Sequence, residues 1–173
     1  MILTIGHSKH SIGDFLDLLV AHQVELVCDV RTIPKSRRNP QFNRENLAAS
    51  LQSRGIAYLH LPELGGLRHA RPDSINSAWR NDSFRGYADY MQTPEFEAAL
   101  DRLVALSEGR RLAIMCAEAV PWRCHRSLVA DALTARGIPV EHILSPTSRQ
   151  PHSYTPFVQV RGGRVSYPGA DQS

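Results

Sequence analysis

Short runs of apolar residues alternate with amphipathic stretches along the chain. Five runs are typical of buried strands, because they are short, continuous and bounded by turn-forming residues. They cover residues 2–5, 24–30, 56–60, 112–116 and 138–144. Between them, apolar positions at helical spacing predict helices that begin near residues 11, 43, 84, 94 and 121. The pattern predicts an α/β protein: a single three-layer domain with a mainly parallel central sheet flanked by helices.

The last part of the chain breaks this alternation. From Ser145 onward it is polar and rich in turn formers, and Gly162 and Gly163 predict a small hairpin. A chain of 173 residues is long enough for one domain with its own core. We therefore expect an α/β domain over residues 1–145 and a C-terminal extension over residues 146–173, which packs on that domain or trails from it.

Composition indicates an ordinary globular chain. Hydrophobic residues make up 42% and charged residues 21%, which argues against disorder and coiled coil. The apolar runs are too short to span a membrane, and the N-terminus lacks the basic and apolar regions of an export signal. Three cysteines are an odd number and fit reduced thiols better than disulfides. These features predict a cytoplasmic protein with no membrane partner.

Arginine carries most of the positive charge. The net charge is +3, and residues 31–44 hold five basic side chains and no acidic one. Pro34 and Pro40 restrict the backbone of this arginine-rich loop. It is predicted either to hold a phosphate, a nucleotide or a nucleic-acid backbone, or to be a solvated loop. Aromatic residues near it are few, which argues against base stacking, and the small net charge favours a small anion over nucleic acid.

Polar residues follow the predicted strands. His7 and Ser8 come after the first strand, Asp29 and Arg31 end the second, and Glu118 follows the fourth. Ligands bind at the carboxyl ends of parallel strands, where these residues are expected to meet. The sequence therefore predicts a polar cleft at that edge.

The densest chemistry lies in residues 115–126. Cys116 ends an apolar strand, and Arg123, Cys124, His125 and Arg126 are expected in the first turn of the next helix. Unpaired backbone N–H groups at a helix N-terminus bind anions. The same N-terminus and the arginines lower the pKa of a nearby thiol, so either cysteine is a candidate reactive thiolate. Cys28, inside the second strand, is expected to be a core residue.

Three chemical interpretations of this stretch remain open. In the first, a cysteine at a strand end followed by an arginine resembles the cradle of rhodaneses and cysteine phosphatases, although those families place five residues between the two. Here six residues separate Cys116 from Arg123, and the loop lacks glycines. In the second, Cys124 and His125 bind a metal together with His7, Glu118 or Cys116, but no close paired-ligand spacing is present. In the third, which we favour, His7, Asp29, Glu63 and Glu118 do acid–base work while arginines hold an anion.

Several motifs together resemble a known family. They are TIGHS at 4–8, DVR at 29–31 followed by Pro34, Ser36, Pro40 and Phe42, LGG at 64–66, MCAE at 115–118 and CHR at 124–126. In this order they are similar to the DUF488 family, a domain of unknown function, over roughly residues 1–145. The resemblance implies a compact cytoplasmic α/β domain and supports the site residues. It implies no particular reaction.

The favoured interpretation is an enzyme, a hydrolase or transferase with thiol or acid–base chemistry, that acts on a phosphorylated or nucleotide-like anion. The predicted catalytic residues are His7, Asp29, Glu118, Cys116 and Cys124. The predicted anion-binding residues are Ser8, Arg31, Arg123, His125 and Arg126. The alternatives are a non-catalytic ligand sensor or nucleic-acid-associated module, and a metal-binding protein with Cys and His ligands. No cofactor or oligomeric state follows from the sequence.

Overall fold

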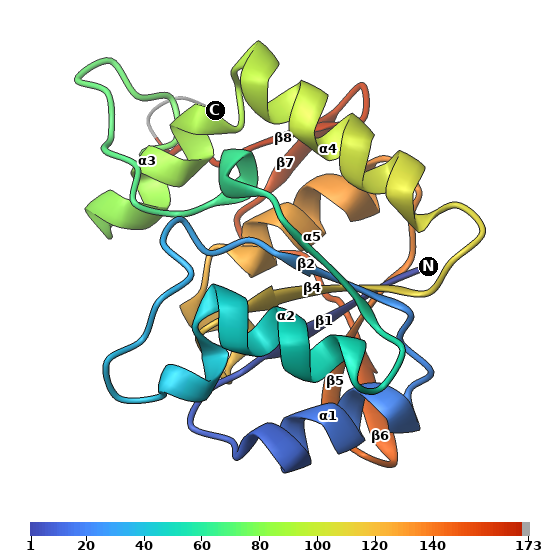
Figure 1. The fold of residues 1–173 in the computed structure, drawn as a ribbon. Helices are drawn as coiled ribbons and strands as arrows, with labels where there is room; N and C mark the ends of the chain where they lie inside the picture. The colour runs from blue at the N-terminus through green and yellow to red at the C-terminus, as the bar shows by residue number, and fades with distance from the viewer. Residues whose placement is uncertain (171–173) are drawn as a thin grey trace.

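The computed structural model describes residues 1–170 and has an α/β fold (Figure 1). The strands are β1 Ile2–Gly6, β2 Leu26–Asp29, β3 Ala57–His60, β4 Leu112–Cys116, β5 Val140–Ser145, β6 Ser148–Pro151, β7 Gln159–Arg161 and β8 Arg164–Ser166. The α-helices are α1 Ile12–Ala21, α2 Arg44–Gln52, α3 Asp82–Tyr90, α4 Pro94–Ser107 and α5 Arg126–Ala135. Short 3-10 turns lie at η1 Pro40–Phe42, η2 Pro62–Leu64 and η3 Pro121–Arg123.

The central sheet is mostly parallel, as the sequence predicts. Its strand order is β3-β2-β4-β1-β5-β6, and β1 to β5 pair in parallel. Only β6 runs antiparallel, against β5. The carboxyl ends of β1, β2, β3 and β4 therefore meet at one edge of the sheet, which brings the residues after these strands together.

Both faces of the sheet are buried at its central strands β1, β2 and β4. Along β4, Leu112, Ile114 and Cys116 belong to one core cluster, which includes side chains of α3, α4 and α5. Ala113 and Met115 belong to a second cluster with side chains of α1 and α2. Successive side chains of a strand point to opposite faces, so a strand buried on both sides is apolar throughout.

The helix after β4 begins later than predicted. Pro121 starts the 3-10 turn η3, and Cys124 then has an extended backbone with φ of -136° and ψ of 149°. An extended residue interrupts helical hydrogen bonding, so α5 begins only at Arg126. Arg123, Cys124 and His125 therefore precede the helix, and the expectation that they lie in its first turn is wrong.

The C-terminal extension contains structure that the sequence did not indicate. Its residues 148–151 form β6, a polar edge strand with no apolar signal. The hairpin at Gly162 and Gly163 is confirmed as β7–β8, with both glycines at positive φ. Tyr167 is fully buried in the core cluster that includes α5. Residues 171–173 of the extension lie outside the described residues, and the boundary at residue 145 stays a prediction.

No helix within residues 1–170 has both the length and the apolar character needed to cross a membrane.

Candidate functional site

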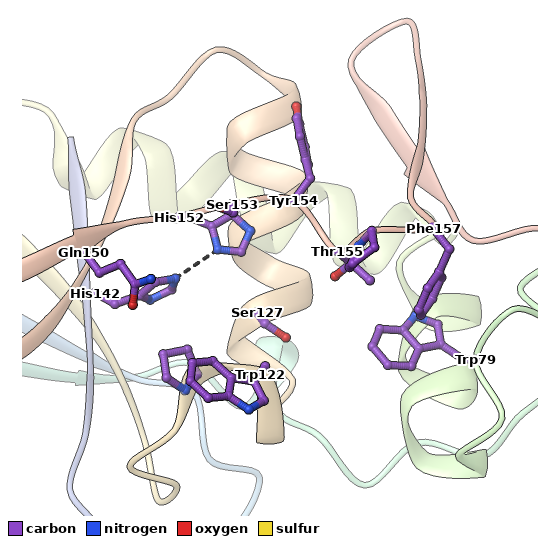
Figure 2. Close-up of a pocket in the computed structure, with 12 residues that line it drawn as sticks. Trp79, Trp122, Ser127, His142, Gln150, His152, Ser153, Tyr154, Thr155 and Phe157 are labelled. Atoms are coloured by element: carbon purple, nitrogen blue, oxygen red, sulfur yellow. Dashed lines mark hydrogen bonds between the residues drawn. The ribbon is translucent and has the colours of Figure 1, made fainter.

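The turn η3 contributes side chains to two cavities. Pro121 and Trp122 line one of about 320 Å³, which is rich in aromatic side chains and which we call the aromatic cavity (Figure 2). Arg123 lines the other, of about 360 Å³, which holds two cysteines and which we call the thiol cavity. The predicted site residues that line the thiol cavity are Arg31, Cys116, Glu118, Arg123, Cys124 and His125. His7, Ser8, Asp29 and Arg126 do not line it.

The two thiols of the cavity are buried and form a pair. Burial alone would raise the pKa of the Cys116 thiol, but a hydrogen bond with Cys124, the Arg126 guanidinium and a hydrogen bond with the Glu118 backbone together hold its pKa below the ordinary value. The pKa of Cys124 is raised well above its ordinary value by that same hydrogen bond to Cys116 and by burial. Cys116 is therefore the better thiolate of the two, while Cys124 keeps its proton.

His125 lies directly beside this pair. Its Nε2 donates to the backbone carbonyl of Val30 at 2.9 Å, because a carbonyl oxygen can only accept, and its Nδ1 lies 3.5 Å from Cys124 Sγ. Burial lowers the pKa of His125 to about 4, although the hydrogen bond to Val30 opposes the shift. The ring is uncharged at neutral pH and offers the cavity an acceptor nitrogen.

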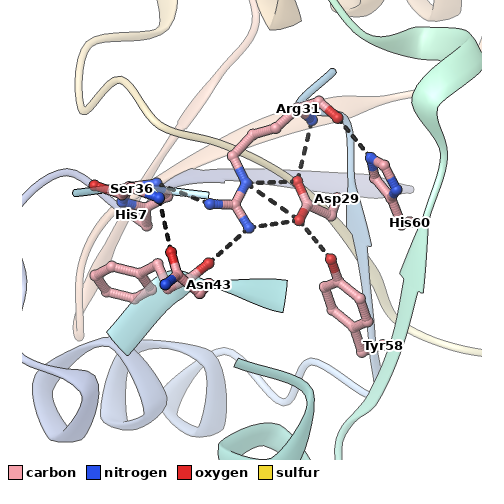
Figure 3. A network of polar contacts seen from close by, with 8 residues as sticks. His7, Asp29, Arg31, Ser36, Asn43, Tyr58 and His60 are labelled. Carbon is pink, nitrogen blue, oxygen red and sulfur yellow. Dashed lines mark hydrogen bonds and ion pairs between the residues drawn. The ribbon is translucent and has the colours of Figure 1, made fainter. Parts of the chain in front are cut away.

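Arg31 is held in place by Asp29 (Figure 3). The Arg31 Nη2 lies 2.7 Å from Asp29 Oδ2 and its Nε lies 2.9 Å from Oδ1, while Nη2 also donates to the Phe42 carbonyl at 2.8 Å. Tyr58 donates its hydroxyl to the same carboxylate at 2.6 Å. Nη1 is the guanidinium nitrogen without a bond to Asp29 or Phe42, and it lies 3.5 Å from His7 Nε2. Asp29 is fully buried, so it acts on the cavity by orienting Arg31.

His7 and Ser8 support the neighbouring loop from outside the cavity. His7 is 3% exposed, and its ring stacks on Phe42 with centroids 4.3 Å apart. Its Nδ1 donates to the Ser8 carbonyl at 2.7 Å, and burial lowers the pKa of the ring. The Ser8 backbone N–H donates to the Ala117 carbonyl at 2.8 Å. These contacts connect β1 to the loop after β4.

Arg126 also holds this loop. Its side chain is 1% exposed, with Nη2 donating to the carbonyls of Glu118 and Ala119 at 3.1 and 3.0 Å and Nη1 donating to Thr4 Oγ1 at 3.1 Å. Its Nε has no partner within residues 1–170. Gly6 is packed just as closely, because a Cβ there would lie 1.7 Å from the Glu118 carbonyl oxygen. The hydrogen bonds of Arg126 and the close packing of Gly6 therefore hold the loop between β4 and η3 in place.

The structure adds residues that sequence analysis missed. Thr32 donates its hydroxyl to the Gly66 carbonyl at 3.0 Å, and a Cβ on Gly66 would lie 3.2 Å from His125 Nδ1. The Tyr87 ring lies against His125 with centroids 5.0 Å apart. All of these residues line the thiol cavity. The LGG motif at 64–66 could have pointed to Gly66 as a cavity residue. Tyr87 has the sequence signature of an ordinary core residue of an amphipathic helix.

The cysteines and histidines do not make a metal centre in the part of the chain that the structure describes. No group of three or more His, Cys, Asp or Glu side chains is placed there to hold a metal ion. The metal-binding alternative therefore has no ligand set within residues 1–170. Cys28, in contrast, is confirmed as a core residue, because it is fully buried and burial raises its pKa to about 12.

These observations define an α/β protein in which two buried thiols line a cavity at the carboxyl edge of a parallel sheet. The sequence matches the family described as domain of unknown function DUF488 over residues 11–133, and the chain belongs to this family. The match confirms the resemblance seen in the motifs, although it begins after TIGHS at 4–8. No curated protein and no solved structure matched the chain in the other two comparisons.

Proposed function

We propose that this protein is an enzyme, a hydrolase or transferase, that binds a small phosphorylated anion in the thiol cavity and uses Cys116 as its nucleophile. The observation that carries the proposal is the presence of two buried thiols, Cys116 and Cys124, in one cavity that basic residues also line. The lowered pKa of the Cys116 thiol supports it. Perturbed titrating groups in a cavity mark functional sites more often than structural ones.

The charges around the cavity favour an anion. Arg31, Lys35 and Arg123 line it, against the single carboxylate of Glu118. The backbone N–H groups of Ala119 and Val120 donate to no backbone carbonyl within the described chain, so they are available to a bound anion. Arg123 suits this role because a planar guanidinium binds two phosphate oxygens at once, whereas Arg31 has only Nη1 left for an anion.

The chemical step follows from the thiol pair. The Cys116 thiolate attacks the phosphorus, a sulfur–phosphorus bond forms, and the leaving oxygen departs with the bond's electron pair and takes a proton from Glu118 at the cavity rim. Glu118 then takes a proton from a water or alcohol whose oxygen attacks the phosphorus. The sulfur–phosphorus bond breaks, its electron pair returns to Cys116 as the thiolate, and phosphate or a phosphorylated acceptor leaves. Cys124 keeps the thiolate hydrogen-bonded between turnovers.

Two further features belong to the proposal. We infer that the two core clusters on opposite faces of the sheet make a three-layer arrangement, which leaves the strand ends open as a polar cleft. Cys28, Cys116 and Cys124 are all free thiols, which fits the reducing cytoplasm expected from the sequence.

Thiol labelling tests the site directly. Under limited iodoacetamide at neutral pH, we expect mass spectrometry to find Cys116 alkylated first and inorganic phosphate to slow its alkylation. Cys28 is the internal control, because it lines neither cavity and its pKa of about 12 should leave it unlabelled. Equal labelling of Cys116 and Cys28, or no protection by phosphate, would overturn the proposed site.

A turnover assay tests the reaction. With a panel of phosphomonoesters and thioesters, we expect activity with at least one phosphomonoester, its loss in Cys116→Ser, and a raised KM in Arg123→Gln. Activity that survives Cys116→Ser would contradict thiol catalysis. Protection of Cys116 by an anion without turnover on any substrate would support the ligand sensor instead.

A further inference from the structure

The aromatic cavity gathers exposed aromatic side chains from distant parts of the chain. Trp122, Tyr154 and Phe157 are 67%, 39% and 39% exposed, and all three line this cavity with Trp79. The Trp79 and Phe157 rings are in edge contact with centroids 4.8 Å apart. Figure 2 shows the Trp79 and Phe157 rings against each other with Trp122 apart from them, while the Tyr154 side chain points away from all three. Clustered exposed apolar surface marks a binding site, and aromatic faces bind planar rings by stacking.

Polar groups without partners line the same cavity. The side chains of Gln150, Ser153 and Tyr154 make no hydrogen bond within residues 1–170. The His142 and His152 imidazoles are already bonded to each other, at 2.9 Å between Nε2 and Nδ1, so they contribute a fixed wall. The aromatic side chains can stack on the face of a ring, and the unpaired polar side chains can bond to atoms at its edge. This combination suits a heteroaromatic ring, which has both an apolar face and polar edge atoms.

The two cavities differ in charge. No lysine or arginine is among the residues that line the aromatic cavity, whereas Arg31, Lys35 and Arg123 line the thiol cavity. Burial lowers the pKa of His142 to about 3, so this ring brings no charge either. A phosphate therefore has partners in the thiol cavity, and an uncharged ring suits the aromatic cavity.

The two cavities share a thin wall. Trp79 of the aromatic cavity stacks on Phe84 of the thiol cavity, with centroids 4.9 Å apart and planes 26° apart. The turn η3 completes the wall, with Trp122 on one side and Arg123, the next residue, on the other. The two cavities are therefore neighbours on either side of this turn.

We propose that the aromatic cavity binds the base of a nucleotide whose phosphate lies in the thiol cavity, with Trp122 as the stacking residue between them. The inference rests on the proposed function and names its substrate class: a nucleotide has a planar heteroaromatic ring at one end and a phosphate at the other. The sequence argued against a stacking platform, because the aromatic residues near the basic loop are few. The cavity is instead built by residues 79, 122, 154 and 157, which only folding brings together.

Titration calorimetry on the full chain tests this assignment. The probes are AMP, GMP, CMP and UMP, their nucleosides, and ribose 5-phosphate as the phosphate without a base. We expect at least one nucleotide to bind more tightly than ribose 5-phosphate. Trp122→Ala should weaken that nucleotide by at least ~5-fold and leave ribose 5-phosphate unchanged, since stacking contributes about 1 kcal/mol or more per base. Trp122→Phe should restore most of the affinity.

Two further variants serve as controls, one outside both cavities and one in the thiol cavity alone. Leu144→Ala removes a side chain that is 53% exposed and lines neither cavity, so nucleotide affinity should not change. Arg123→Gln should weaken nucleotides and ribose 5-phosphate alike and leave the nucleosides unchanged.

The outcomes distinguish this inference from the proposed function. If no nucleotide binds better than ribose 5-phosphate, or Trp122→Ala changes nothing, the base subsite is wrong, and protection of Cys116 by phosphate still supports the thiol enzyme. If nucleotides bind through Trp122 but Cys116 is neither protected nor needed for turnover, the subsite stands and the proposed enzyme mechanism fails.

Discussion

Arg31 and Asp29 form an ion pair that is almost completely shielded from water, with Nη2 2.7 Å from Oδ2 and exposed fractions of 6% and 0%. The pair lies at the carboxyl end of β2, where a buried charge has no solvent to stabilise it. Removal of one partner from such a pair leaves the other charge unpaired in a low-dielectric region. The position of the Arg31 guanidinium at the thiol cavity thus depends on the Asp29 carboxylate, which does not line the cavity.

Asp29→Ala should therefore destabilise the fold by about 3–5 kcal/mol, measured as the free energy of unfolding in urea. The matched control is Asp73→Ala, because Asp73 pairs with Arg71 at the surface, where both side chains are largely exposed. Its cost should be at most about 1 kcal/mol. Similar small losses in both variants would show that Arg31 finds another partner without Asp29.

Gly6→Ala should disturb the loop after β4, because the new Cβ would lie 1.7 Å from the Glu118 carbonyl oxygen. We expect a loss of about 1–3 kcal/mol in unfolding free energy, as for other overpacked sites, together with slower alkylation of Cys116. Gly13→Ala is the control, since nothing lies within 4 Å of its Cβ on the helix α1. It should stabilise the protein by about 0.5–1 kcal/mol. Unchanged Cys116 labelling in Gly6→Ala would contradict a rigid loop.

Acid should destabilise the protein through two buried histidines. Burial, together with the nearby Arg126 guanidinium, lowers the pKa of His125 to about 4, and burial together with His152 and Arg126 lowers that of His142 to about 3. Below pH 6.5 the unfolded chain binds protons at these rings that the folded chain does not, so stability falls as the pH drops from about 6.5 towards 4.

The lowered pKa of His125 alone corresponds to a loss of about 3 kcal/mol in the free energy of unfolding at pH 4. Urea unfolding at pH 4 to 7 measures the slope, which His125→Asn should reduce. His69→Gln, at an exposed residue, should keep the slope of the parent protein. A stability that is flat between pH 4 and 6.5 would contradict buried neutral histidines.

Asp131 should hold the C-terminal extension against α5. Its carboxylate accepts hydrogen bonds from His152 Nε2 at 2.7 Å, from the Thr155 backbone and hydroxyl at 3.1 and 2.7 Å, and from the Tyr167 hydroxyl at 2.8 Å. Asp131→Ala removes all of these acceptors at once and leaves buried donors unpaired.

We expect faster hydrogen exchange and proteolysis in residues 148–167 of Asp131→Ala, while β1, β2 and β4 keep their protection. Asp101→Ala serves as the control, because Asp101 forms an exposed ion pair with Arg136. Uniform loss of protection across the sheet would mean that the extension and the central sheet unfold as one unit.

Much of the fold was predictable because local patterns encode it. Residues 112–116 are apolar at every position, and only a strand buried on both faces needs that pattern. The start of α5 was not predictable, because Pro121 favours a helical turn in any context while the extended backbone of Cys124 comes from packing. The polar strand β6 was missed for a similar reason: it is an edge strand, and its pairing with β5 needs no apolar side chains.

The candidate site was predictable only in part. Cys116, Cys124 and Arg123 were identified from their place after a strand, and they line one cavity. Asp29 and Arg126 come from the same motifs, but their side chains bond to Arg31 and to the carbonyls of Glu118 and Ala119. Sequence spacing gives the position of a side chain along the chain and does not say which way it points.

The sequence by itself determined a mostly parallel sheet and the set of polar residues at its strand ends, because the periodicity of apolar residues and the polarity of parallel strands are local properties. Only the tertiary structure decided which of those residues face a cavity and which hold the loop beneath it. It also decided that Trp79, Trp122 and Phe157 line one cavity. Contacts between residues far apart in the chain depend on how the helices and the extension pack on the sheet, and no local pattern records that packing.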